Sequence, residues 1–410
     1  MFGRRYISKD GLVAKENPQG WNAIRVIAIA RAISLLGDEL AVFALMLREK
    51  HNGGGALSIA AILIAGQLPL ILLSPWAGTV VDRVPVRRLA PIVSVLQGVF
   101  AGLLAVKAPL AISLLLICLI GVGQAFTGPA WSATLPELVG KEVMPRAMSL
   151  MQALYAIAGM AGPATAGIMV SKLGYTTPML TDAASFALLA IVPLFLSLPF
   201  HARQRGPRVK GDVWVGLQIV WHEPLIRTLS ILGFSLNLTL GIYSVAQLFF
   251  VLDDLHASVF IYGLVGSTFA GAMLVTAVIN ERREVSQEQL PTNIMVGALL
   301  AGLGVVLTGS SWHWALLFPT AALAGVGVVT LNAYFMALIL QRAPDESRGR
   351  VTAAVQGIAS AGQIVSIALG GIVVSAIDPR IAILLSGIAC LVVTVVLWPM
   401  VIGAAVKKST

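Results

Sequence analysis

Long apolar stretches alternate with short polar connections along almost the whole chain. A helix needs about 20 predominantly apolar residues to cross the hydrocarbon core of a bilayer. The pattern therefore predicts twelve membrane-spanning helices, at residues 22–47, 57–80, 88–106, 111–135, 145–172, 178–198, 225–250, 258–279, 292–309, 313–340, 351–376 and 381–405. Because twelve is an even number, both termini are expected on the same side of the membrane.

The longest polar interruption divides these spans into two groups of six. Its second part, DVWVGLQIVWHEPLIRTL, carries apolar residues at helical spacing and predicts an amphipathic helix at the membrane surface, with Trp214 and Trp221. We expect an N-terminal tail, a first six-helix bundle, a linker, a second six-helix bundle and a C-terminal tail, at residues 1–21, 22–198, 199–224, 225–405 and 406–410.

The two halves also resemble each other. LPELVGKEVMPRAMSL (135–150) and LQRAPDESRGRVTAAV (340–355) each place a proline, acidic residues and an arginine at the mouth of a helix. Small residues then recur at every fourth position, which lets membrane helices approach closely; they are Ala158, Gly162 and Ala166 in the first half and Ala353, Gly357 and Ala361 in the second. The pattern predicts an all-α polytopic membrane protein, a transporter with its site between two related bundles.

Composition and charge support a membrane location. Only 11% of the residues are charged, whereas soluble domains carry roughly 25%, so the chain cannot cover itself with a polar surface. Of its 28 lysines and arginines, 22 belong to the side of the termini, and the other side holds Arg48, Lys50, Lys107, Lys172 and Arg380. The positive-inside rule then places both termini in the cytoplasm, with the protein in the cell membrane.

Several classes of function find no support in the chain. The net charge of +9 is spread over short loops, so we expect no nucleic-acid partner. The two cysteines lie inside apolar segments and the five histidines are scattered, so neither a metal site nor an enzymatic centre is expected. A G-x-x-x-x-G-K-[ST] loop is missing, so ATP is not the expected energy source. We expect no cofactor, and a proton gradient as the driving force.

Ionisable groups inside the hydrocarbon are costly and indicate function. Four lie far enough inside predicted spans to fall within the hydrocarbon: Arg31, Asp38, Glu39 and Asp182. Asp38 is the expected proton site, because removal from water favours the neutral form of a carboxyl group. Alternatively, it stays charged and pairs with Arg31 through water. Seven residues separate these two, a rise of about 10.5 Å, too long for a direct salt bridge, so each is expected to have another partner.

The other two acids are weaker candidates for proton coupling. Glu39 points about 100° away from Asp38, so we expect only one of the two to face a cavity squarely, and Glu39 alternatively approaches the outer interface. Asp182 lies one turn into its span, where we expect it to cap or anchor the helix rather than carry a proton.

Polar and aromatic residues in spans 1, 4, 7, 10 and 11 are candidates for contact with cargo. An alternative role for each is to hold helices together. A cavity lined with amides and aromatics, and with few charges, suits a large amphiphilic molecule. The candidates are Gln124, Asn237, Tyr243, Gln247, Asn332, Tyr334, Phe335, Gln356 and Gln363.

A dense cluster of charge lies between the second and third spans. It reads G-x-x-x-D-R-x-x-x-R-R and consists of Gly78, Asp82, Arg83, Arg87 and Arg88. It resembles the signature of the major facilitator superfamily between helices 2 and 3, with Pro85 and Val86 in place of the usual glycine and basic residue. The resemblance implies a gate, in which the aspartate accepts hydrogen bonds from a helix N-terminus. The alternative is that these arginines only set topology.

Three further segments narrow the resemblance. RAISLLGDELAVFAL (31–45), FTGPAWSATLPELV (126–139) and APDESRGRV (343–351) resemble the drug–proton antiporter branch that holds macrolide and enterobactin-type siderophore exporters. Gly162, Pro163 and Gly167 are similar to the G-P-x-x-x-G element of antiporters. The resemblance implies a monomeric exporter in contact with membrane lipid, which moves amphiphilic small molecules against protons by alternating access.

Other functions stay open from the sequence alone. A siderophore exporter and a lysophospholipid flippase share the same patterns, and topology does not fix the direction of transport. A non-transporting receptor and a membrane enzyme are the least favoured interpretations.

Overall fold

The computed structural model describes residues 18–139, 144–196, 212–283, 285–343 and 347–406. Twelve long helices and one short helix make up most of these residues. They are α1 (Pro18–His51), α2 (Ala56–Arg83), α3 (Val86–Leu104), α4 (Leu110–Val139), α5 (Met144–Leu173), α6 (Thr176–Phe195), the short α7 (Asp212–His222), α8 (Pro224–Phe249), α9 (Val259–Glu281), α10 (Leu290–Gly309), α11 (Leu317–Arg342), α12 (Arg348–Ala376) and α13 (Pro379–Val406).

Each long helix overlaps one of the predicted spans. Eleven of them are long and apolar enough to cross a membrane by length and composition. The remaining long helix, α1, has 34 residues and carries Arg25, Arg31, Asp38 and Glu39 near its middle. Its charges, rather than its length, set it apart, which makes α1 the helix most in need of a functional explanation.

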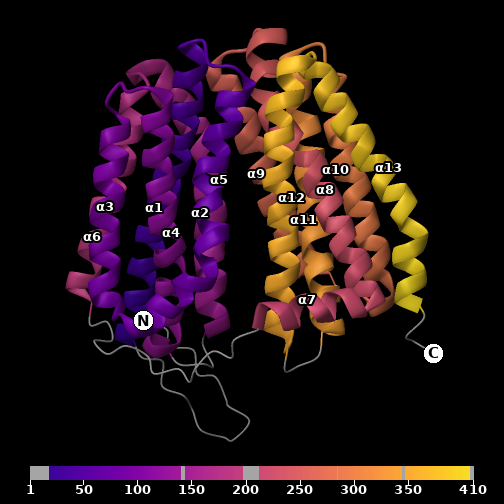
Figure 1. Cartoon of the computed structure of the whole chain (residues 1–410), viewed down its shortest axis with the longest axis horizontal. Coiled ribbons are helices and arrows are strands. Elements are labelled where there is room, and N and C mark those ends of the chain that lie inside the picture. The colour runs from indigo at the N-terminus through magenta and orange to yellow at the C-terminus, as the bar shows by residue number, and fades with distance from the viewer. Residues whose placement is uncertain (1–17, 140–143, 197–211, 284, 344–346, 407–410) are drawn as a thin grey trace, which may run out of the picture.

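The helices form two groups (Figure 1). α1 to α6 lie together on one side and α8 to α13 on the other. The first residues of α1 and the last residues of α13 lie at the same end of the molecule, which we call the terminal end; the opposite end is the distal end. α7 lies at the terminal end and packs against α12 and α8. Its predicted Trp221 is exposed, whereas the side chain of Trp214 lies outside the described residues.

Two pairs of helices join the groups, α5 with α9 and α2 with α12. A Cβ atom added at Gly263 of α9 would overlap the carbonyl oxygen of Pro163 in α5. In the other pair, a Cβ atom at Gly371 of α12 would lie 2.8 Å from that of Ala60 in α2. Small residues thus bring the halves into backbone contact. α5 is the fifth long helix of the first half, and α12 is the fifth long helix of the second. Each of them contacts the opposite half, which agrees with two related bundles.

The expected spacing of small residues on α12 is only partly used for packing. Gly357 has no neighbouring atom within 4 Å of a Cβ position. The closest approaches occur further along the helix, at Gly362, where a Cβ atom would lie 2.9 Å from the Phe234 carbonyl oxygen, and at Gly371. The prediction assigned the close contacts to the wrong small residues of α12, because small residues occur on several faces of this helix.

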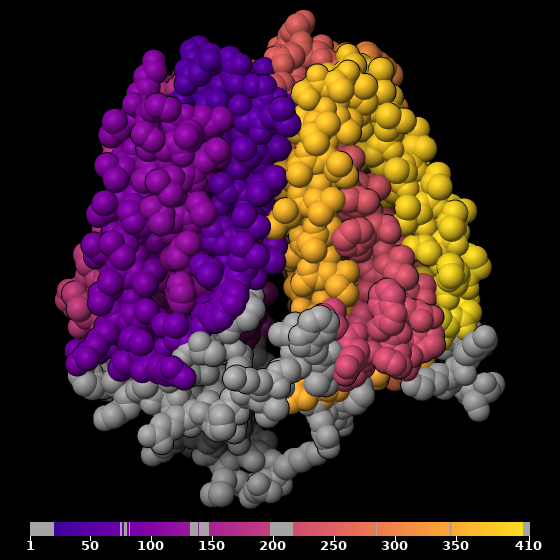
Figure 2. All heavy atoms as spheres, viewed as in Figure 1, coloured from indigo at the N-terminus to yellow at the C-terminus, as the bar shows by residue number. Residues whose placement is uncertain are grey.

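The halves meet at the distal end and diverge toward the terminal end (Figure 2). Lys50 Nζ of α1 lies 2.6 Å from Asp253 Oδ1, in the π-helical turn Phe250–Asp254 that follows α8. The rings of Phe43 in α1 and Tyr262 in α9 stack with their centroids 5.0 Å apart. The distal side is therefore closed by one ion pair, one aromatic pair and the two seams of small residues.

Within the second half, α10 and α11 also pack backbone to backbone. A Cβ atom at Gly327 would overlap the Ala301 nitrogen and would lie 2.8 Å from the Ala301 Cα. We therefore expect Gly327→Ala to destabilise the protein by about 1–3 kcal/mol, as overpacking does. Thermal unfolding in detergent measures this, with Gly357→Ala as the control in open space. An unchanged unfolding temperature for Gly327→Ala would contradict the close packing.

The Lys50–Asp253 ion pair should favour the distally closed state only modestly, because Asp253 is half exposed and exposed pairs contribute about 0–1 kcal/mol. We expect Lys50→Gln to increase the distally open population by about 2- to 5-fold at low salt. Spin labels on cysteines at the exposed distal positions Asn52 and Trp312 report the distance between the halves. Lys50→Asp combined with Asp253→Lys should restore the original distribution; failure of this exchange would assign the effect to something other than the pair.

Candidate functional site

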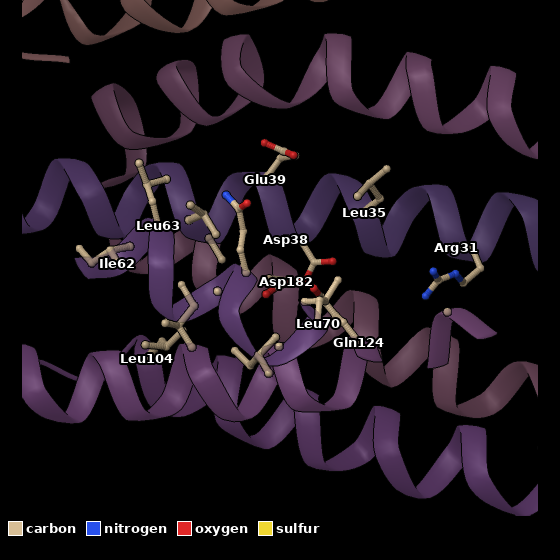
Figure 3. A pocket seen from close by; sticks show the side chains of 18 of the residues that line it. Arg31, Leu35, Asp38, Glu39, Ile62, Leu63, Leu70, Leu104, Gln124 and Asp182 are labelled. Atoms are coloured by element: carbon tan, nitrogen blue, oxygen red, sulfur yellow. The ribbon is translucent and has the colours of Figure 1, made fainter. Parts of the chain in front are cut away.

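A cavity of about 550 Å³ lies within the first half. The lining comes mainly from α1, α2 and α4, with Tyr155 from α5 and Asp182 from α6. It brings together all four ionisable residues singled out in the sequence, Arg31, Asp38, Glu39 and Asp182, together with Gln124. Figure 3 shows these five side chains around the same space. The rest of the lining is largely aliphatic, so the charged groups lie in a medium of low polarity.

Arg31 has a partner on another helix. Its Nε donates a hydrogen bond of 3.4 Å to the Tyr155 hydroxyl oxygen in α5, and its guanidinium carbon lies 6.0 Å from the centre of the same ring. This agrees with the prediction, from the seven-residue spacing, that Arg31 and Asp38 each have another partner.

Asp38 is half-buried at the middle of the site. The amide of Gln124 in α4 donates a hydrogen bond to its carboxylate, and the charges of Arg31 and Glu39 act on it from the same helix. Gln124 was predicted as a cargo contact. The structure places it in the first half's cavity, beside Asp38.

Asp182 lies deeper than expected. Its side chain is 1% exposed, and its Oδ1 atom lies 2.6 Å from the position that a Cβ atom at Gly37 would occupy. The Ser185 hydroxyl lies 2.7 Å from the Asp182 backbone oxygen and 3.3 Å from Oδ1. The expectation that Asp182 caps its helix is wrong, because the N-cap residue is Tyr175 and the missing side chain at Gly37 lets the Asp182 carboxyl group reach the backbone of α1 beside Asp38. The alternative role of Asp182 as an anchor of α6 stays a prediction.

Glu39 lines the same cavity from another direction. Its side chain is exposed and points away from Asp38 (Figure 3). It lies toward α5, where a Cβ atom at Gly162 would be 2.8 Å from the Glu39 Cβ. Both acids line the cavity, and the prediction that only one of them faces it squarely stays a prediction. The Gly162 of the predicted antiporter element provides room for Glu39.

The rest of that element lies on the seam between the halves. Pro163 contacts Gly263 and Gly266 of α9, and the Ala164 backbone N–H donates a 3.1 Å hydrogen bond to Ser267 Oγ. A Cβ atom at Gly167 would lie 3.0 Å from the Val259 carbonyl oxygen. The G-P-x-x-x-G element is therefore a contact surface between the halves.

Two cavities of about 290 Å³ and 320 Å³ lie in the second half and share Asn237 and Gln363. They collect seven of the eight predicted cargo residues of this half: Asn237, Tyr243, Gln247, Asn332, Phe335, Gln356 and Gln363. Their lining residues include no charged side chain. The eighth candidate, Tyr334, is buried elsewhere, and its hydroxyl donates a 3.4 Å hydrogen bond to Asn280 Oδ1.

Two residues of the first cavity were not predicted. Gln67 lies in the apolar segment AILIAGQLPL, and Tyr155 lies in α5. An amide in an otherwise apolar span was a detectable signal for Gln67. Tyr155 could not be found in the same way, because its importance depends on the contact with Arg31.

The charged cluster between α2 and α3 lies at the terminal end. Arg83 ends α2, and α3 begins at Val86, so only Val84 and Pro85 connect the helices. Arg83, Arg87 and Arg88 are exposed. The side chain of Asp82 and the surroundings of Gly78 lie outside the described residues.

Comparison with known proteins agrees with this architecture. The Major Facilitator Superfamily model matches residues 27–319 and 293–409. The multidrug efflux pump Tap of Mycobacterium tuberculosis is 26% identical over 367 residues, which cover 84% of this chain and 85% of that protein. Tap of Mycolicibacterium fortuitum is 29% identical over a shorter stretch, 44% of this chain and 48% of that one.

Two more distant likenesses extend over most of the chain. Macrolide efflux protein A of Streptococcus pyogenes is 22% identical over 383 residues, which cover 89% of this chain and 93% of that protein. The crystal structure of the nucleoside transporter NupG superposes with a TM-score of 0.75 at 13% identity, covering 92% of this chain and 99% of that one. This last likeness concerns the fold alone.

The eleven apolar helices, the family match and the likeness to efflux pumps together define a polytopic membrane transporter rather than an enzyme. The chain belongs to the Major Facilitator Superfamily.

Proposed function

We propose that this protein exports amphiphilic small molecules, of the drug or macrolide type, across the cell membrane in exchange for protons. The observation that carries the proposal is the difference in chemistry between the cavities of the two halves. The first half gathers three carboxyl groups and one arginine in a cavity, and the second half offers neutral amides and aromatics. The names of Tap and macrolide efflux protein A support drug-like cargo.

The proton step would take place at Asp38. Burial favours the neutral form of a carboxyl group, whereas Arg31 and the Gln124 amide favour the ionised form. A group balanced between these influences can take up a proton from one side of the membrane and release it to the other. Glu39, which is exposed and lines the same cavity, would respond to cargo or to water. No cofactor is needed, because the proton gradient supplies the free energy.

Orientation follows from charge. With 22 of its 28 lysines and arginines on the side of the termini, the terminal end would be cytoplasmic. The distally closed arrangement would then be open to the cytoplasm, the state that receives cargo for export. Arg83, Arg87 and Arg88 would belong to the gate on this side, pairing with acids of neighbouring loops in the opposite state. The proposed unit is a monomer surrounded by membrane lipid.

The proposal is tested in proteoliposomes that contain a pH-sensitive dye and carry an inward-acidic gradient. Erythromycin represents macrolides, and ethidium, enterobactin and a lysophospholipid represent the competing cargo classes. Proton release triggered by erythromycin or ethidium supports drug export. A response confined to enterobactin or to the lysophospholipid would replace the proposal with the corresponding alternative, and cargo movement without proton movement would refute antiport.

Asp38→Asn should abolish proton-driven transport, by about 100-fold or more, because an amide cannot take up and release a proton at the site. Counterflow of the same probe, which needs no net proton movement, should be largely retained. Glu281→Gln, which removes an exposed acid at the end of α9, is the matched control and should leave both rates unchanged. Undiminished uphill transport by Asp38→Asn would exclude Asp38 as the essential carrier.

A further inference from the structure

We propose that Asp38 and Asp182 form one carboxyl pair that binds a single proton between them, so that Asp182 is part of the proton site. The inference rests on the proposed function and deepens it, because it replaces a single proton carrier with a pair contributed by two helices. Three observations carry it: the close approach at Gly37, the balance of charge in the cavity, and the separate hydrogen-bond partner of each carboxyl.

The approach of α6 to α1 depends on Gly37, the residue immediately before Asp38. A Cβ atom at this position would lie 2.6 Å from both Asp182 Oδ1 and Ser185 Oγ, and 3.0 Å from the Asp182 Cα. Any other residue would therefore push the Asp182 side chain away from α1. The approach places Asp182 against the residue next to Asp38, both side chains line the same cavity (Figure 3), and the charge of Asp38 acts on Asp182.

The surrounding charges are too few to neutralise two carboxylates. Among the described residues of the cavity, Arg31 is the one base, and Glu39 adds a further acid. Arg48 of α1 also contacts α6, through Met179 Sδ at 3.6 Å, but a 2.7 Å hydrogen bond holds it at the Leu104 carbonyl oxygen toward the distal end. Tyr155 is the titratable group that α5 brings to the cavity.

The other neighbours of the pair are neutral. α4 contributes Gln124 and α2 contributes Gln67. α3 packs against α6 at Gly98, whereas its Arg87 and Arg88 lie in its exposed first turn. One proton on the pair leaves a single negative charge to oppose Arg31, whereas two bare carboxylates would leave an uncompensated charge in a low dielectric.

Each carboxyl group also has its own donor. The Gln124 amide serves Asp38, and the Ser185 hydroxyl lies 3.3 Å from Asp182 Oδ1. The two donors belong to different helices, Gln124 to α4 and Ser185 to α6 itself. The pair joins α1 to α6 while it is protonated, and loss of the proton replaces that attraction with repulsion between like charges.

Infrared titration of the purified protein in D₂O tests the pair without any cargo. The C=O stretch of protonated carboxyl groups is followed against pH in the wild type, Asp38→Asn and Asp182→Asn. For a shared proton, removing either carboxyl should move the titration midpoint of the remaining one by about 1 pH unit or more. A remaining carboxyl that titrates at its wild-type midpoint in both variants would show two independent groups and overturn the proposal.

A second variant guards against misfolding of Asp182→Asn. Gly37→Ala keeps both acids but adds a methyl group where Asp182 Oδ1 approaches, so it should reproduce the midpoint shift. Gly159→Ala, at a helical glycine with no atom within 4 Å of a Cβ position, should leave the midpoints unchanged. If a folded Gly37→Ala protein titrates like the wild type, the contact between α1 and α6 does not couple the carboxyls, and the pair is refuted.

The infrared result and the transport result are distinguishable. Coupled midpoints without proton release in proteoliposomes would retain the pair and refute antiport. Proton release that is driven by erythromycin and survives in Asp182→Asn would retain antiport and refute the pair. When both hold, Asp182→Asn should reduce proton-driven exchange as strongly as Asp38→Asn, while Asp182→Glu should recover part of it.

Discussion

The cost of placing charge in hydrocarbon governs the organisation of this molecule. α1 carries Arg31, Asp38 and Glu39 through the middle of the first half, and each would be unfavourable if it faced lipid. Neighbouring groups offset that cost. Tyr155 accepts a hydrogen bond from Arg31, Gln124 lies beside Asp38, and one cavity holds all three ionisable groups. The helices packed around α1 therefore form a polar interior, and the apolar positions of the other helices are left to face lipid.

The second half meets the same constraint differently, because no charged side chain of the described residues lines its cavities. Its cavities are lined with amides, hydroxyls and aromatics, groups that cost much less to bury than a charge. A molecule held there would be recognised by shape and a few hydrogen bonds, without strong demands on its charge. In the proposed exchange, placing the ionisable groups in one half and the neutral groups in the other would separate the driving ion from the cargo in space.

The sequence predicted the helices well because hydropathy and the positions of glycine, proline and charge are local properties. It also located the four ionisable residues, since any charge within a span stands out. It misjudged the capping role of Asp182, because the surroundings of that side chain depend on what another helix places opposite. Gly37 is the instructive example: a glycine beside Asp38 is ordinary in a membrane helix, and its importance appears only when Asp182 is seen against it. The position of Tyr334 was missed for the same reason, because its side chain bonds to Asn280 and lines neither cavity of the second half.

The seams between the halves have a consequence for how this chain can vary. Gly263 and Gly371 meet backbone or Cβ atoms of the opposite half, and Gly167 does the same from α5. Every replacement of glycine by another amino acid adds side-chain atoms, so no conservative replacement exists at these positions. Substitutions on the lipid-facing surface meet no such restriction, whereas a side chain added at a seam glycine would push the two halves apart. We therefore expect substitutions to accumulate at exposed leucines and valines, and the glycines of the seams to be retained.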